Sequence, residues 1–180
     1  MVILRPTRKL SLLLPTTTIG RLTSDTALGD WYVNRIIVHR HPLLLLVSSA
    51  ALLPMLVPAR DVRNLPVRLA NLVEVRLRHL GIGTRAISAE RSAMARVEIA
   101  PTVNRSVLGV MVDFAKSVPY YLEHGDSSES ALRLAEDRLA QTPCYAGRPF
   151  DRVIFPEKKA PEVLRVKWPA RTGENNDRGT

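Results

Sequence analysis

Five residues near the middle of the chain combine side chains that suit the binding of an anion: Asn104, Arg105, Ser106, Gly109 and Asp113. Asn104 can cap a helix by accepting hydrogen bonds from its first free N–H groups. Such a helix start attracts negative charge, and Arg105 adds a cation beside it. Arg105, Gly109 and Asp113 are spaced four apart and therefore share one helix face. The pattern predicts a binding site for an anionic group.

Asp30 and Trp31 complete the set of candidate binding residues. If the fold brings Asp30 to Asn104, Arg105 and Asp113, the cluster could hold an anion and use either aspartate as a base. The chain offers no histidine or second carboxylate at a spacing typical of catalysis, so catalytic residues stay unassigned. The structural alternative is a cap, a surface arginine and a glycine that lets two helices touch.

The elements around these residues can be predicted from their periodicity. Residues 96–100 alternate polar and apolar side chains, as in a half-buried strand, and Pro101 ends it. A helix then starts after Thr102 or Asn104, with an apolar stripe and with Pro119 ending or kinking it near residue 118. The stripe consists of Val107, Met111, Phe114 and Val118.

The rest of the chain predicts an α+β fold, a small mostly antiparallel sheet packed against several amphipathic helices. Residues 43–47 are all apolar and suit a central strand. Asn64 begins and Gly81 ends a helix with apolar residues at helical spacing. We expect one domain over residues 1–157 and a polar, disordered tail over residues 158–180.

An uncharged stretch, residues 41–59, is long enough to span a bilayer as a helix. Ser48, Ser49 and Pro54 interrupt it, so we predict two buried strands and no membrane partner. The single cysteine, Cys144, fits a reducing compartment and a cytoplasmic location, and it serves better as an apolar filler than as a nucleophile. No cofactor motif is present, and we predict no metal site.

The formal charge of +9 is concentrated in residues 1–80, which hold eleven Lys and Arg residues against four acids. A basic half could attract nucleic acid. However, no basic run exceeds two residues, and aromatic side chains for base stacking are sparse. Nucleic-acid binding therefore remains one of several possibilities.

Three segments, residues 27–32, 52–61 and 102–114, together resemble an uncharacterised family of small bacterial proteins, a domain of unknown function of about this length. The resemblance covers roughly residues 1–155, and the motif at 104–109 is its most specific part. It implies a cytoplasmic α+β domain with no established activity.

The chain departs from the family pattern at two places. Residues 48–51 are Ser-Ser-Ala-Ala where the resemblance implies an asparagine and an acid. Val110 and Val112 stand where it implies a serine and an asparagine. An enzymatic function loses support from these departures, and whether the chain is an enzyme stays open.

The sequence thus predicts a protein of unknown function, best described as a non-enzymatic binding or regulatory domain with a protein partner. An accessory role in a bacterial mobile-element or defence system fits this prediction. The alternatives are a small enzyme that acts on an anionic substrate and a nucleic-acid-binding protein that uses the basic half.

Overall fold

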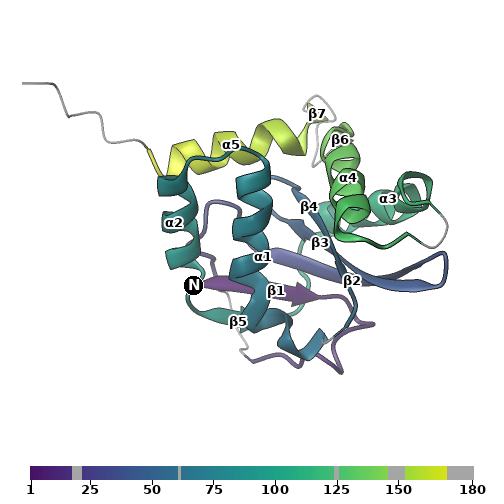
Figure 1. Cartoon of the computed structure of the whole chain (residues 1–180). Coiled ribbons are helices and arrows are strands. Elements are labelled where there is room, and N and C mark those ends of the chain that lie inside the picture. Colours follow the sequence, from purple (N-terminus) through teal and green to yellow (C-terminus); the bar gives the residue numbers. More distant parts are fainter. Residues whose placement is uncertain (18–21, 61, 124–125, 146–152, 170–180) are drawn as a thin grey trace, which may run out of the picture.

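The apolar runs of the chain form a five-stranded sheet in the order β4-β3-β2-β1-β5 (Figure 1). The computed structural model describes residues 1–17, 22–60, 62–123, 126–145 and 153–169. β1 pairs in parallel with β2 and β5, whereas β2–β3 and β3–β4 are antiparallel ladders that contain most of the paired residues. The strands are β1 Val2–Pro6, β2 Trp31–Val38, β3 His41–Ser48, β4 Pro54–Pro58 and β5 Val97–Ile99.

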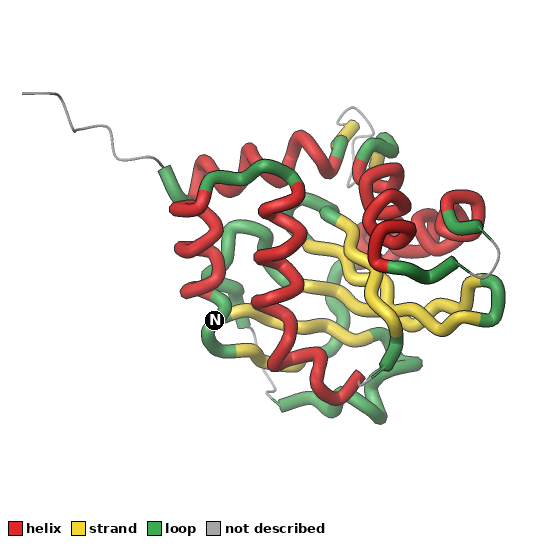
Figure 2. Tube along the Cα trace, in the orientation of Figure 1, coloured by secondary structure: helices red, strands yellow, loops and turns green. Residues whose placement is uncertain are grey.

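Helices cover both faces of this sheet, and Figure 2 shows its strands between them. On one face lie α1 Leu65–His79, preceded by the short helix η1 Val62–Asn64, α2 Thr84–Ala93 and α5 Pro156–Lys167. On the other lie α3 Arg105–Tyr121 and α4 Glu129–Ala140. β6 Cys144–Tyr145 and β7 Val153–Ile154 form a separate two-stranded ladder. The predicted α+β class is confirmed.

The central strand β3 is apolar on both sides because each face of the sheet has its own core. Leu44 and Leu46 pack into the core beneath α1, and Leu43 and Leu45 pack into the core beneath α3. Successive side chains of a strand point to opposite faces, so a strand buried on both faces needs an unbroken apolar run. Residues 41–59 accordingly form β3 and β4. Among the helices that the structure describes, none is long and apolar enough to cross a membrane.

α3 begins as its sequence predicts, with Asn104 as the cap and Val107, Met111, Phe114 and Val118 buried. It runs through Pro119 to Tyr121, so Pro119 does not end the helix, and the alternative of a kink at this position stays a prediction. The ring nitrogen Nε2 of His39, from the β2–β3 turn, lies 3.2 Å from the Pro119 carbonyl oxygen. This contact from outside the helix holds the turn that contains the proline.

Residues 158–167 continue α5, although the sequence predicted a polar tail from residue 158. Ala160 and Leu164 are buried, four residues apart, beneath a surface rich in lysine. Just after the helix, the Trp168 indole N–H donates to Glu90 Oε2 at 2.8 Å. Buried apolar side chains of the core beneath α1 and this hydrogen bond thus hold a segment whose composition alone suggests a tail. The rest of that predicted tail from residue 170 onward lies outside the described residues.

Candidate functional site

α1 carries a buried arginine on its apolar stripe. Arg76 follows Leu69 by seven residues and Leu72 by four, so helical geometry directs it inward with them. Its side chain is only 2% exposed. Burying a guanidinium without partners is costly, so its surroundings must supply carboxylates or other acceptors.

α4 carries a charge of the opposite sign, because one residue of its apolar stripe is a glutamate. Leu132, Ala135 and Leu139 are buried, and Glu136 occupies the same face. Its Oε1 accepts a hydrogen bond of 2.7 Å from the backbone N–H of Leu56 in β4. Its Oε2 lies 3.6 Å from Arg76 Nε. The two groups form an ion pair at this distance, but the distance is too long for a hydrogen bond.

This glutamate accepts a hydrogen bond from the only backbone N–H group of β4 that faces away from β3. In an antiparallel ladder, alternate residues point their backbone groups toward and away from the partner strand. The Leu56 N–H points away from β3 toward Glu136, so positions 54 and 58 face the same way. Both are prolines, which have no N–H. β4 is an edge strand, and this arrangement prevents a further strand from pairing through its donors.

Arg76 is hydrogen-bonded to Asp137, whereas its contact with Glu136 is only the longer ion pair. Its Nη1 donates to Asp137 Oδ1 at 2.5 Å, and the ring nitrogen Nε2 of His79 lies 2.7 Å from Asp137 Oδ2. Within the described part of the chain, Nε and Nη2 of Arg76 are buried and have no hydrogen-bond partner. The guanidinium therefore has two buried donor nitrogens without a hydrogen bond to the described residues, and Nε has only its long ion pair with Glu136.

The two carboxyl groups near Arg76 respond in opposite ways to their surroundings. Burial raises the pKa of Glu136 to about 7, outweighing the Leu56 hydrogen bond and the positive charge of Arg76. Burial also acts to raise the pKa of Asp137, but hydrogen bonds from Arg76 and His79 outweigh it and lower that pKa. Asp137 is thus the permanent counter-ion of Arg76, and Glu136 is a group that gains or loses its proton near neutral pH.

Arg76, His79 and Glu136 line a cavity of about 380 Å³ between α1, α4 and β4, which we call the Arg76 cavity. α1 and α4 cover opposite faces of the sheet and flank its β4 edge (Figure 1). Half of the lining residues are apolar: Met55, Leu56, Val57, Pro58, Leu72, Val75 and Leu132. The charged or polar groups are Arg68, Arg76, His79, Ser127, Glu129, Arg133 and Glu136. A cavity of this size and character is typical of a small-molecule site.

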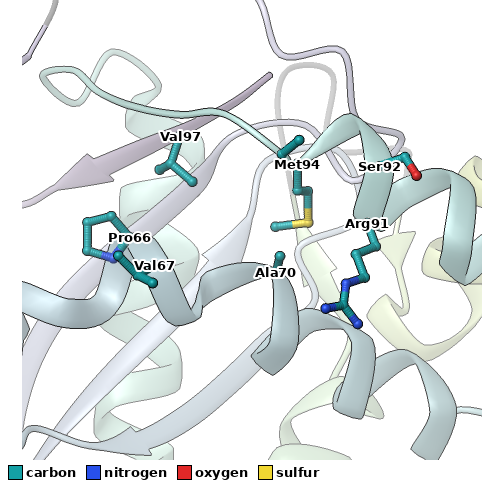
Figure 3. Close-up of a pocket in the computed structure, with 8 residues that line it drawn as sticks. Pro66, Val67, Ala70, Arg91, Ser92, Met94 and Val97 are labelled. Atoms are coloured by element: carbon teal, nitrogen blue, oxygen red, sulfur yellow. The ribbon is translucent and has the colours of Figure 1, made fainter.

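A second groove, lined by Pro66, Val67, Ala70 and the end of α2, is larger but more open to solvent. Figure 3 shows Met94 lying against it, with Arg91 at the end opposite Pro66. Arg91 already pairs with Glu74. Among the described residues that line this groove, none has a buried side-chain donor without a hydrogen bond, so it has less to hold a charged ligand than the Arg76 cavity.

Asp30 and Trp31 lie at the start of β2, where both serve the fold. Asp30 forms a buried ion pair with Arg5 and accepts from Ser24 Oγ at 2.6 Å, so both carboxylate oxygens have partners. Trp31 is fully buried in the core beneath α1. In this arrangement Asp30 has little capacity to act as a base.

Asn104 acts as a helix cap, as one of the two alternatives from the sequence requires. Its side-chain oxygen accepts from the N–H groups of Ser106 and Val107 at 2.9 and 3.3 Å. Its own N–H donates to the Tyr32 hydroxyl at 3.0 Å, which ties the start of α3 to β2. Arg105 follows on the exposed surface.

Ser106, Gly109 and Asp113 line a small cleft of about 290 Å³ between α3 and residues 142–145. A methyl group added at Gly109 would meet no atom of the described residues within 4 Å, so the glycine does not admit any of the described helices. Cys144 lies in the cleft wall, where burial, and secondarily the charge of Asp113, raises the pKa of its thiol to about 11. The thiol is therefore a poor nucleophile.

The seven residues predicted from the sequence thus fall in three places, and none of them lines the Arg76 cavity. The residues missed were Arg76, His79, Glu136 and Asp137. A signal was present, because Arg76 and Glu136 each occupy a stripe position where the other members are apolar. What the sequence does not show is that these two opposite charges face each other across 60 residues.

The arrangement defines an α+β domain with a ligand-sized cavity built on a buried arginine. Comparison with curated proteins and with solved structures found no match. The model of a family described as "Domain of unknown function (DUF6933)" matches residues 3–159. The chain belongs to this family, in agreement with the resemblance seen in its sequence.

Proposed function

We propose that the chain is a non-catalytic binding domain that holds a small organic anion in the Arg76 cavity. The observation that carries this proposal is the guanidinium of Arg76, which is buried beside the cavity with Nε and Nη2 unpaired among the described residues. Paired donors in a fixed fork suit a carboxylate, sulfate or phosphate group.

The lining indicates the rest of the ligand. Apolar side chains from β4, α1 and α4 surround the position beside Arg76 and suit an alkyl or aromatic body. Arg68 also lies at this cavity and favours a negatively charged head group, whereas Arg133 is paired with Glu129 and His79 with Asp137. An extended peptide is a poor occupant, since β4 offers no free outward N–H between Pro54 and Pro58 with which to pair it.

The proposal is tested by isothermal titration calorimetry with four probes that share an eight-carbon chain: octyl sulfate, octanoate, 1-octanol and octylammonium. We expect the two anions to bind at least tenfold more tightly than the alcohol and the cation not to bind. Hydrogen bonds to a charged group contribute about 1.5–3 kcal/mol, so Arg76→Gln should weaken anion binding by about 10- to 100-fold.

Two further variants separate loss of binding from loss of folding. Arg78→Gln changes an exposed arginine on the same helix that does not line the cavity, and it should leave the affinity unchanged. Val75→Trp fills the cavity from its half-exposed rim without touching Arg76, and it should abolish binding in a folded protein. The proposal fails if no anion binds, or if Val75→Trp and Arg76→Gln both bind octyl sulfate as the unmodified protein does.

A further inference from the structure

We infer that the Arg76 cavity takes up its anion together with one proton, which is bound by Glu136. This inference rests on the proposed function and adds to it the chemical state in which the site is occupied. It makes Glu136 a residue that determines which head groups fit, since a protonated carboxyl group donates a hydrogen bond that a carboxylate cannot.

The first step of the argument is geometric. Oε1 of Glu136 is occupied by the Leu56 N–H, and Oε2 faces Arg76 Nε across 3.6 Å. An anionic oxygen that accepts from the unpaired Nε or Nη2 of Arg76 must therefore come close to Oε2. Two negatively charged oxygen groups this close in a buried site disfavour each other's ionised form, so binding of a proton by one of them is favoured.

The second step is to identify which group is protonated. A sulfate monoester, whose acid is strong, keeps its charge, and Asp137 is held ionised by hydrogen bonds from Arg76 and His79. Glu136 is buried, and its burial already raises its pKa to about 7. The proton comes from solvent and binds Oε2, which then donates to the ligand oxygen while Oε1 continues to accept from Leu56.

The charges around Glu136 come from two helices. Arg76 faces it from α1, and Arg133 and Asp137 act on it from α4 itself. His79 of α1 contacts Asp137, and Asp137 in turn acts on Glu136. β4 contributes the Leu56 N–H and no ionisable side chain. α3 and α5 also pack against α4, but in the described chain none of their charged residues is among those that act on Glu136.

The consequence is an affinity that falls as pH rises. With a pKa of about 7 in the free protein, Glu136 is mostly ionised at pH 8, so binding should take up about 0.9 proton per ligand. The dissociation constant should increase by up to about tenfold per pH unit above pH 7.

The test is calorimetric titration with octyl sulfate, whose charge does not change between pH 6 and pH 9. Tris and triethanolamine buffers have different ionisation enthalpies and are cations, so they report proton uptake without competing for the site. We expect uptake near one proton at pH 8 in the unmodified chain. Glu136→Gln should bind octyl sulfate with no proton uptake and with an affinity that does not depend on pH.

His79→Gln is the control, because an imidazole can also gain a proton in this pH range. It should keep the proton uptake at pH 8. The inference is overturned if octyl sulfate binds the unmodified chain without proton uptake, or if Glu136→Gln retains the uptake; the proposed function survives either result. If octyl sulfate and octanoate bind at no pH, both the proposed function and the inference fail.

Discussion

Replacing Glu136 by glutamine should make the free protein more stable, by an amount that depends on pH. The pKa of this carboxyl group is raised from an ordinary 4.5 to about 7, chiefly by burial. The neutral form is therefore the one that the folded state favours. Its contribution to stability is complete below pH 4.5 and is lost as the pH rises through 7.

The magnitude follows from the separation of the two pKa values. At about 1.4 kcal/mol for each pH unit between them, ionised Glu136 destabilises the fold by roughly 3 kcal/mol. The amide of glutamine can accept from the Leu56 N–H and carries no charge. The free energy of unfolding of Glu136→Gln should therefore be higher than that of the unmodified chain, by about 1 kcal/mol or less at pH 5 and by roughly 3 kcal/mol at pH 7 and above.

Urea denaturation between pH 4.5 and pH 8, followed by tryptophan fluorescence, measures this difference, because Trp31 is fully buried. Glu129→Gln is the matched control on the same helix, where an exposed glutamate pairs with Arg133. It should change stability by less than about 1 kcal/mol at every pH. A Glu136→Gln difference that is constant across this pH range, or negative at pH 7, would refute the argument.

Three further predictions concern α3 and its cleft. Gly109→Ala should stabilise the protein by up to about 1 kcal/mol in thermal denaturation, because the added methyl group meets no atom and helical glycine is unfavourable; a lower melting temperature would contradict this. Asn104→Ala should destabilise the protein by about 1 kcal/mol through loss of the cap, whereas Asn104→Asp should retain most of that stability. Cys144 should react slowly with a thiol reagent at pH 7.5, and its rate should still be rising at pH 9.5, because its pKa is raised to about 11.

Much of the fold could be predicted because its signals are local. The apolar run at 43–47, the helix that Gly81 ends and the stripe led by Val107 each follow from spacing within a few residues. The strand order could not be predicted in this way. β1 lies between β2 and β5 in parallel pairs, and residues 2–4 meet residues 97–99 only through the fold.

The candidate site illustrates the same limit more sharply. Capping chemistry narrowed the start of α3 to Thr102 or Asn104, and the structure shows Asn104 as the cap, which depends on residues two and three positions away. Helical periodicity could not separate Asp30 from Asn104 and Asp113, since only the Arg5 ion pair shows that Asp30 is already engaged. A binding site made from two helices and a strand edge depends on contacts between distant residues, which composition and spacing do not encode.

The charge on Glu136 is the feature of this site that structure alone does not require. Blocking the edge of β4 needs only an acceptor for the Leu56 N–H, and a glutamine in the same place would supply one without a buried charge. Neutralising Arg76 needs only Asp137, whose carboxylate already accepts a hydrogen bond of 2.5 Å from Arg76 Nη1. A carboxyl group that destabilises the fold when ionised therefore adds something that neither role provides. In the proposed site, that additional role is to accept a proton when an anion binds to Arg76. A local loss of stability is common at binding sites.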